Sequence, residues 1–210
     1  MRTQEEEVIN AYSHLMSAVI SLVFCIIFLG RVIETIHQIQ IFLLGIVSFW
    51  TFFSSFVYHN TKKPKLRQRN LVLDRVGIYL MISANGLSFA LGSEDDVVKI
   101  LYCAIILCVN CFLVARYCCF KREESELYSV SSCLLFSVLC IFPITGILSE
   151  NLLVNQETIF SLIFGLMCYC AGVIFYTIDS KKWAHTVWHV LVIAGYSGCF
   201  IAHLISMKAL

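Results

Sequence analysis

Two histidines of this 210-residue chain stand four residues apart, in the segment His185-Thr-Val-Trp-His189. In a helix this spacing places both imidazole rings on one face, where they can bind one metal ion. His59, far away in the sequence, offers a third imidazole. Three neutral histidines and an open fourth position are typical of catalytic zinc, so these residues predict a Zn²⁺ site.

Asp74 and Ser55 are the candidates for catalytic work beside that metal. A carboxylate near a zinc-activated water can accept its proton, or it can orient a ligand histidine. Ser55 precedes His59 by one helical turn, on the same face, where it could hold the water or a substrate carbonyl. The spacing also allows a simpler interpretation, in which the histidines are hydrated at a membrane surface and Asp74 pairs with Arg75 or Lys65.

The elements that must position these residues belong to a very apolar chain. Hydrophobic residues make up 59% of it and charged residues only 14%, and the mean hydropathy is +0.82. This composition excludes an ordinary soluble domain and indicates an integral membrane protein, whose partner is the lipid bilayer. The 15 Lys and Arg residues nearly balance 14 Asp and Glu residues, which argues against a nucleic-acid partner.

A helix needs about 20 apolar residues to cross a hydrocarbon core about 30 Å thick, and seven stretches reach that length. We therefore predict an all-α integral membrane fold with seven transmembrane helices, in which residues 1–210 form one domain. The expected spans lie near residues 11–30, 40–59, 71–92, 97–117, 129–148, 157–178 and 186–206.

The positions of Lys and Arg predict the orientation, because these residues are retained on the cytoplasmic side. The N-terminal segment and the even-numbered connections carry Arg2, Lys62, Lys63, Lys65, Arg67, Arg69, Arg116, Lys121, Arg122, Lys181 and Lys182. The opposite side carries only Arg31, Lys99 and Lys208. The N-terminus is therefore expected in the cytoplasm and the C-terminus outside, in a plasma membrane, which is the inner membrane if the cell is bacterial. In this arrangement the candidate site lies at the cytoplasmic ends of its helices.

The sequence also predicts where the other three histidines lie relative to the membrane. His14 lies near the same cytoplasmic boundary, where it is either a further polar contact of the site or a hydrated residue at the interface. His37 is expected in an external loop. His203 is expected near the outer end of the last span, and both are interpreted as surface or interfacial residues.

Small residues and prolines predict how the spans pack. Gly165 and Gly172 are seven apart on one side of the sixth span, where small residues let helix backbones approach closely in lipid. Pro143 and Gly146 predict a kink in the fifth span.

Four segments resemble the hemolysin III family, relatives of the progestin and adiponectin receptors and of the alkaline ceramidases. In chain order they are Glu5 to His14, Ser55 to His59, Leu73 to Tyr79, and Gly165 to Tyr176 followed by His185 to His189. The resemblance implies seven helices, zinc held by the three histidines named above, and Asp74 and Ser55 beside the activated water. The short termini are similar to those of the bacterial-type members. The chain departs from the family at Arg75, where relatives often have histidine, which concerns the substrate-facing part of the third span.

The leading functional hypothesis is a zinc-dependent hydrolase of lipid amides or esters, such as a ceramide-like molecule, with a role in membrane homeostasis. One alternative is a membrane-perturbing or channel-forming protein, as the family name suggests. Another is a lipid-sensing, receptor-like protein, and in both alternatives the zinc is structural. No span carries the regularly spaced polar stripe expected of a channel wall, which favours the hydrolase.

Overall fold

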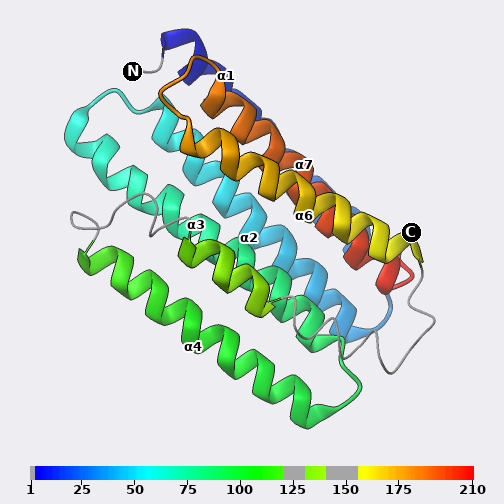
Figure 1. Ribbon diagram of the computed structural model, residues 1–210. Coiled ribbons are helices and arrows are strands. Elements are labelled where there is room, and N and C mark those ends of the chain that lie inside the picture. The colour runs from blue at the N-terminus through cyan, green and yellow to red at the C-terminus, as the bar shows by residue number, and fades with distance from the viewer. Residues whose placement is uncertain (1–2, 121–130, 141–155) are drawn as a thin grey trace.

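The computed structural model describes residues 3–120, 131–140 and 156–210. These residues form seven helices and no strand (Figure 1). The helices are α1 (Gln4–Leu29), α2 (Thr35–Asn60), α3 (Pro64–Leu91), α4 (Asp96–Phe120), the helix Ser131–Cys140, α6 (Gln156–Thr177) and α7 (Ala184–Ser206). The kink expected at Pro143 and Gly146 lies outside the described residues.

Five helices in the described parts of the chain are long and apolar enough to cross a membrane: α1, α2, residues 96–119 of α4, α6 and α7. The prediction of an all-α membrane protein is therefore confirmed. α3 is 28 residues long but is not one of the five, and it carries buried polar residues such as Ser83 and Ser88. The described part of the fifth helix, Ser131–Cys140, is apolar but shorter than a full span.

The two faces of α1 show why these helices belong in lipid. Its buried face carries polar and small side chains at helical spacing, namely Glu6, Asn10, His14, Ser17, Ser21 and Cys25. The expectation that no span carries a polar stripe was therefore wrong for α1, whose stripe is covered by neighbouring helices. Its exposed face carries large apolar side chains, including Val19, Ile20 and Val23. A surface helix of a water-soluble protein has the opposite pattern, with its apolar stripe toward the core. The exposed face therefore suits contact with hydrocarbon.

The helices pack in the order α4, α3, α2, α1, α7 and α6, and α3 also contacts α7 (Figure 1). The start of α1 and the end of α7 lie at opposite ends of the array. Because neighbours in the row α3, α2 and α1 run in alternating directions, the end of α2 lies beside the starts of α1 and α3. The start of α7 joins them at the same end, which carries all three histidines of the predicted site.

α6 and α7 approach each other unusually closely. A Cβ atom added at Gly198 of α7 would lie 2.8 Å from the Ser161 carbonyl oxygen and 2.9 Å from the Gly165 backbone nitrogen, both on α6. A Cβ atom at Gly172 would lie 2.8 Å from the Trp188 ring. The predicted packing role of Gly165 and Gly172 is therefore met, and the contact fixes α7 against its neighbour.

Three helices begin at least five residues before the expected spans, namely α1, α2 and α3. α2 begins at Thr35, so His37 lies in its first turn, with Nδ1 3.6 Å from a Glu34 oxygen, and its expected place in a loop was wrong. α3 begins at Pro64, because a proline ring already has the φ angle that the first helical position requires. The basic segment 65–69 is consequently helical and lies beside the candidate site.

Candidate metal centre

The structure brings together the three histidines that the sequence singled out. His59 lies in the last turn of α2, and His185 and His189 lie in the first two turns of α7. All three side chains are buried, and one ring nitrogen from each lies within 4.8 Å of the other two. The His59 ring centroid is 5.4 Å from that of His185 and 4.7 Å from that of His189. The group could hold one metal ion.

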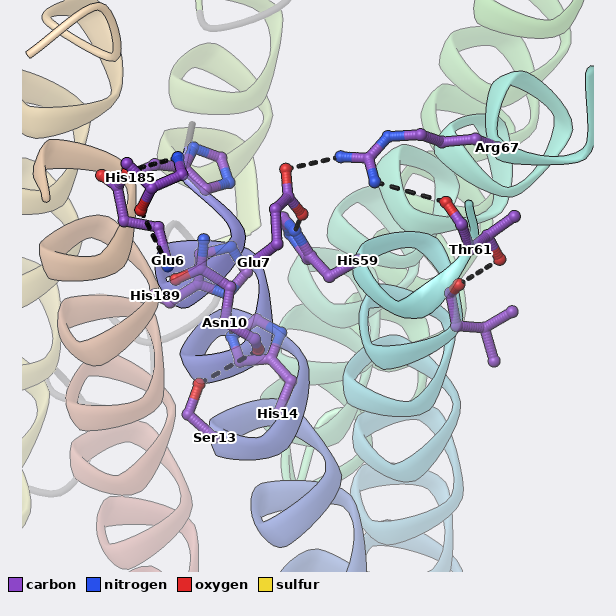
Figure 2. A network of polar contacts seen from close by, with 12 residues as sticks. Glu6, Glu7, Asn10, Ser13, His14, His59, Thr61, Arg67, His185 and His189 are labelled. Carbon is purple, nitrogen blue, oxygen red and sulfur yellow. Dashed lines mark hydrogen bonds and ion pairs between the residues drawn. The ribbon is translucent and has the colours of Figure 1, made fainter. Parts of the chain in front are cut away.

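A carboxylate from α1 orients His59. Glu7 Oε2 lies 2.7 Å from His59 Nδ1, and Glu7 Oε1 accepts a hydrogen bond of 2.7 Å from Arg67 on α3. Figure 2 shows Glu7 between these two partners. The Arg67 guanidinium also lies 4.5 Å from the centre of the Tyr58 ring, which helps to hold it in place. Three helices thus cooperate to fix one imidazole.

The other two histidines also have a neighbouring side chain at Nδ1. Asp179, in the connection between α6 and α7, places Oδ1 3.2 Å from His185 Nδ1, a close contact whose alignment falls short of a hydrogen bond. His189 Nδ1 is 2.7 Å from Nε2 of His14, a fourth buried histidine on α1. Each of the three clustered imidazoles therefore meets a protein group at Nδ1.

Because Glu7 lies at His59 Nδ1 and His14 lies at His189 Nδ1, these two histidines would bind a metal through Nε2. His59 Nε2 is buried and has no hydrogen-bond partner in the described part of the protein. A buried polar atom without a partner costs about 1–3 kcal/mol, and a metal bond would remove that cost. Histidines that bind metals usually donate their other N–H group to a carboxylate or similar acceptor. Glu7 and Asp179 are the carboxylates that would accept here. The residues present therefore fit a zinc ion.

Glu6 holds the start of α7 in position. Its Oε1 accepts a 2.5 Å hydrogen bond from the backbone N–H of Trp183, the residue before α7. Its Oε2 accepts another from the Thr3 N–H, while the Thr3 hydroxyl accepts from the Glu6 N–H, which caps α1. Trp183 has a φ of 66°, which is rare for a bulky residue. The contact fixes this uncommon turn two residues before His185.

A largely apolar cavity of about 330 Å³ opens beside the histidines. Its polar wall includes His14, Ser55, Asp74, Arg75, His185 and His189. From there it follows α3 from Leu71 to Phe89, about 27 Å at 1.5 Å per residue. The two predicted catalytic residues, Ser55 and Asp74, thus lie on the same cavity as two of the predicted ligands.

Arg75, which departs from the family pattern, lines the same cavity. Its guanidinium carbon lies 5.4 Å from the centre of the Tyr176 ring on α6. The simpler interpretation of the sequence, hydrated histidines at the membrane surface, does not hold for the three clustered histidines, because all are buried.

The structure decides between the two interpretations of His14 and contradicts the expectation for His203. His14 is 6% exposed and contacts His189, so it is a polar contact of the site and not a hydrated interfacial residue. His203 is 1% exposed, with Nδ1 3.2 Å from the Ser88 hydroxyl and its ring stacked on Phe89 at 3.7 Å. The end of α7 packs against the end of α3, which covers His203.

Glu7 and Asp179 were not predicted as partners of the histidines. One signal could have identified the first: Thr3 and Glu6 have the capping-box spacing, which predicts a helix that starts near residue 4. In such a helix Glu7, Asn10 and His14 share a face. Asp179 lies outside a regular helix, and no sequence signal indicated it.

Comparison with known proteins identifies the family of the chain. The chain matches the family described as Haemolysin-III related over residues 2–200. It is also 25% identical over 210 residues to the protein named Hemolysin-3 from Bacillus cereus, covering 95% of this chain and 91% of that relative. The matched region, residues 2–200, includes every residue of the histidine cluster and its partners.

Proposed function

Since the chain belongs to the haemolysin-III related family and gathers three buried histidines beside an apolar cavity, we propose that it is a zinc-dependent hydrolase of lipid amides or esters. The observation that carries the proposal is the grouping of His59, His185 and His189 at a cavity also lined by Asp74 and Ser55. A zinc ion held there supplies Lewis acidity, which activates water near neutral pH and polarises a carbonyl group.

The side chains around the cavity have distinct roles in this proposal. Glu7, Asp179 and His14 hold the three imidazoles in position through their Nδ1 atoms. The Asp74 carboxylate accepts a proton from the attacking water and returns it to the leaving group. Ser55, buried on the same wall, binds the substrate carbonyl or the water. The apolar part of the cavity takes the hydrocarbon chain and excludes bulk water.

We also propose that seven helices cross the plasma membrane and that the N-terminus is cytoplasmic. The distribution of Lys and Arg along the chain supports this orientation. The histidine cluster then lies in the cytoplasmic half of the bilayer, and the lipid substrate enters from that leaflet.

The test compares zinc content with turnover of a fluorescent ceramide analogue by the purified protein in detergent. The Asp74→Ala variant should keep its zinc and lose about 100-fold or more in turnover, because general acid–base catalysis contributes about 10²–10⁴. Glu94→Ala, which removes an exposed carboxylate between α3 and α4, is the matched control and should retain both. Zinc binding with undiminished turnover by Asp74→Ala would contradict the proposed mechanism.

Other outcomes would assign a different function. A relative is named Hemolysin-3, so membrane disruption is the second candidate. Release of dye from liposomes by a folded variant that carries both His185→Ala and His189→Ala would support it. Stoichiometric zinc without turnover of any lipid amide or ester would instead support a lipid-sensing protein with a structural metal.

A further inference from the structure

His14 is a buried histidine in which one ring nitrogen has a hydrogen-bond partner and the other has none among the described residues. Its Nε2 is 2.7 Å from His189 Nδ1. Its Nδ1 is buried and has no hydrogen-bond partner among the described residues. The side chain is 6% exposed, its ring packs edge-on against Phe52 at 5.2 Å, and it lines the cavity beside the histidine cluster.

The short contact between the two rings determines where each carries its proton. Two neutral imidazoles form a hydrogen bond only if one nitrogen carries a hydrogen and the other does not. When His189 binds a metal through Nε2, its remaining hydrogen is on Nδ1, so His189 donates and His14 Nε2 accepts. A neutral His14 that accepts at Nε2 carries its own hydrogen on Nδ1. The atom without a partner is then a hydrogen-bond donor.

A buried donor in a cavity wall needs an acceptor, and the protein supplies none in its described part. The cavity is otherwise largely apolar, so an oxygen atom of a bound lipid is the acceptor that chemistry favours. A carbonyl group near the polar end of such a lipid would lie within the same wall as Ser55 and Asp74. A hydrocarbon ligand alone would leave the donor without a partner.

We propose that His14 is a substrate-binding residue, which accepts a hydrogen bond from His189 at Nε2 and donates one from Nδ1 to a carbonyl oxygen of the lipid in the cavity. This inference rests on the proposed function for the metal at His189. It adds a fourth histidine to the site, with a role in recognising the ligand and not in binding the metal.

The first experiment measures the proton position directly. In zinc-loaded protein labelled with ¹⁵N-histidine, the ring spectrum of His14 should report a neutral imidazole with its hydrogen on Nδ1. A scalar coupling between His189 Nδ1 and His14 Nε2 should identify the shared hydrogen bond. A hydrogen on His14 Nε2 would overturn the proposal.

The second experiment measures binding without turnover. The probes are 2-tetradecanone, which has a carbonyl and cannot be hydrolysed, and n-tetradecane, which has no acceptor. His14→Phe should weaken binding of the ketone about tenfold, because it removes one hydrogen bond. Binding of the alkane should stay within about twofold of that of the unmodified protein. Equal weakening of both probes, or none, would contradict the proposal, since a structural role does not distinguish the two.

Two controls separate this inference from the proposed function. Zinc content is measured in every variant, and His14→Gln, which keeps an acceptor and a donor, should recover part of the preference for the ketone. If His14→Phe fails to fold, the His14→Gln variant and the spectrum of the unmodified protein still decide the proposal. Wild-type protein that binds no zinc and turns over no lipid would refute the proposed function, while the ketone preference would still report on His14.

Discussion

Glu7 Oε2 lies 2.7 Å from His59 Nδ1, although the two residues are 52 positions apart in the sequence. The same carboxylate accepts a hydrogen bond from Arg67. One acidic side chain near the start of α1 therefore joins the end of α2 to the start of α3, at the place where the proposed metal ligands meet.

Replacing this carboxylate should weaken metal binding. Groups that hydrogen-bond to a ligand histidine typically contribute about 10–100-fold to metal affinity, so we expect a loss of that size in Glu7→Gln. Competition with a chromogenic chelator measures it. Glu5→Gln, which changes an exposed carboxylate two residues earlier, is the matched control and should bind zinc normally. Equal affinities in the two variants would exclude an orienting role for Glu7.

Metal removal should destabilise the protein. A ligand that binds only the folded state stabilises it by about 2.7 kcal/mol when its free concentration is 100 times Kd. Chelation should therefore lower the Tm of the detergent-solubilised protein, and added zinc should restore it. The Tm of His59→Ala should respond to neither treatment. If the Tm of the unmodified protein did not change with zinc, the histidine cluster would not bind zinc.

Loss of Glu6 should disturb the metal site from a distance. Glu6→Ala removes the acceptor of the Trp183 N–H and should release the turn before α7, lowering both Tm and zinc affinity. Thr3→Ala removes only the hydroxyl that caps α1, at a cost of about 1 kcal/mol, and should leave zinc affinity unchanged. If both variants lose zinc affinity equally, the effect arises from fraying of α1 and not from the link to α7.

The contact between α6 and α7 should tolerate no side chain at Gly198. The new Cβ atom in Gly198→Ala would meet backbone atoms, which cannot rotate away, and overpacking of this kind costs about 1–3 kcal/mol. Thermal unfolding measures the change. Gly30→Ala is the control, because the nearest atom to a Cβ at Gly30 is 3.5 Å away. A Tm for Gly198→Ala equal to that of Gly30→Ala would mean that the helices separate without cost.

The sequence predicted the parts of the fold and site that depend on local spacing. The apolar stretches predicted the helices, and the four-residue interval between His185 and His189 predicted that both rings lie on one face. His59 ends one predicted span, and His185 and His189 begin another, at the same side of the membrane. The sequence therefore predicted that all three lie at a common depth. These steps follow from the length of the apolar stretches and from helix geometry.

Partners that depend on the rotation of one helix against another could not be predicted in this way. His14 and His203 were interpreted from their depth in the membrane, but depth does not say whether a residue faces lipid, water or another helix. The structure turns both toward neighbouring helices and buries them. Asp179 was out of reach for a related reason, since its contact with His185 depends on how the connection between α6 and α7 folds, and Trp183 adopts a left-handed conformation there.

The distribution of the cluster along the chain has a consequence for biosynthesis. A ribosome delivers α1 and α2 to the membrane well before α7, which carries two of the three histidines. Until α7 is inserted, His59 has its partner Glu7 but no second imidazole, and metal capture by the three together is impossible. Under the proposed function, zinc loading would therefore report that the last of these helices has been inserted in the correct register. Truncated or misinserted chains would lack the metal and, with it, part of their resistance to proteolysis.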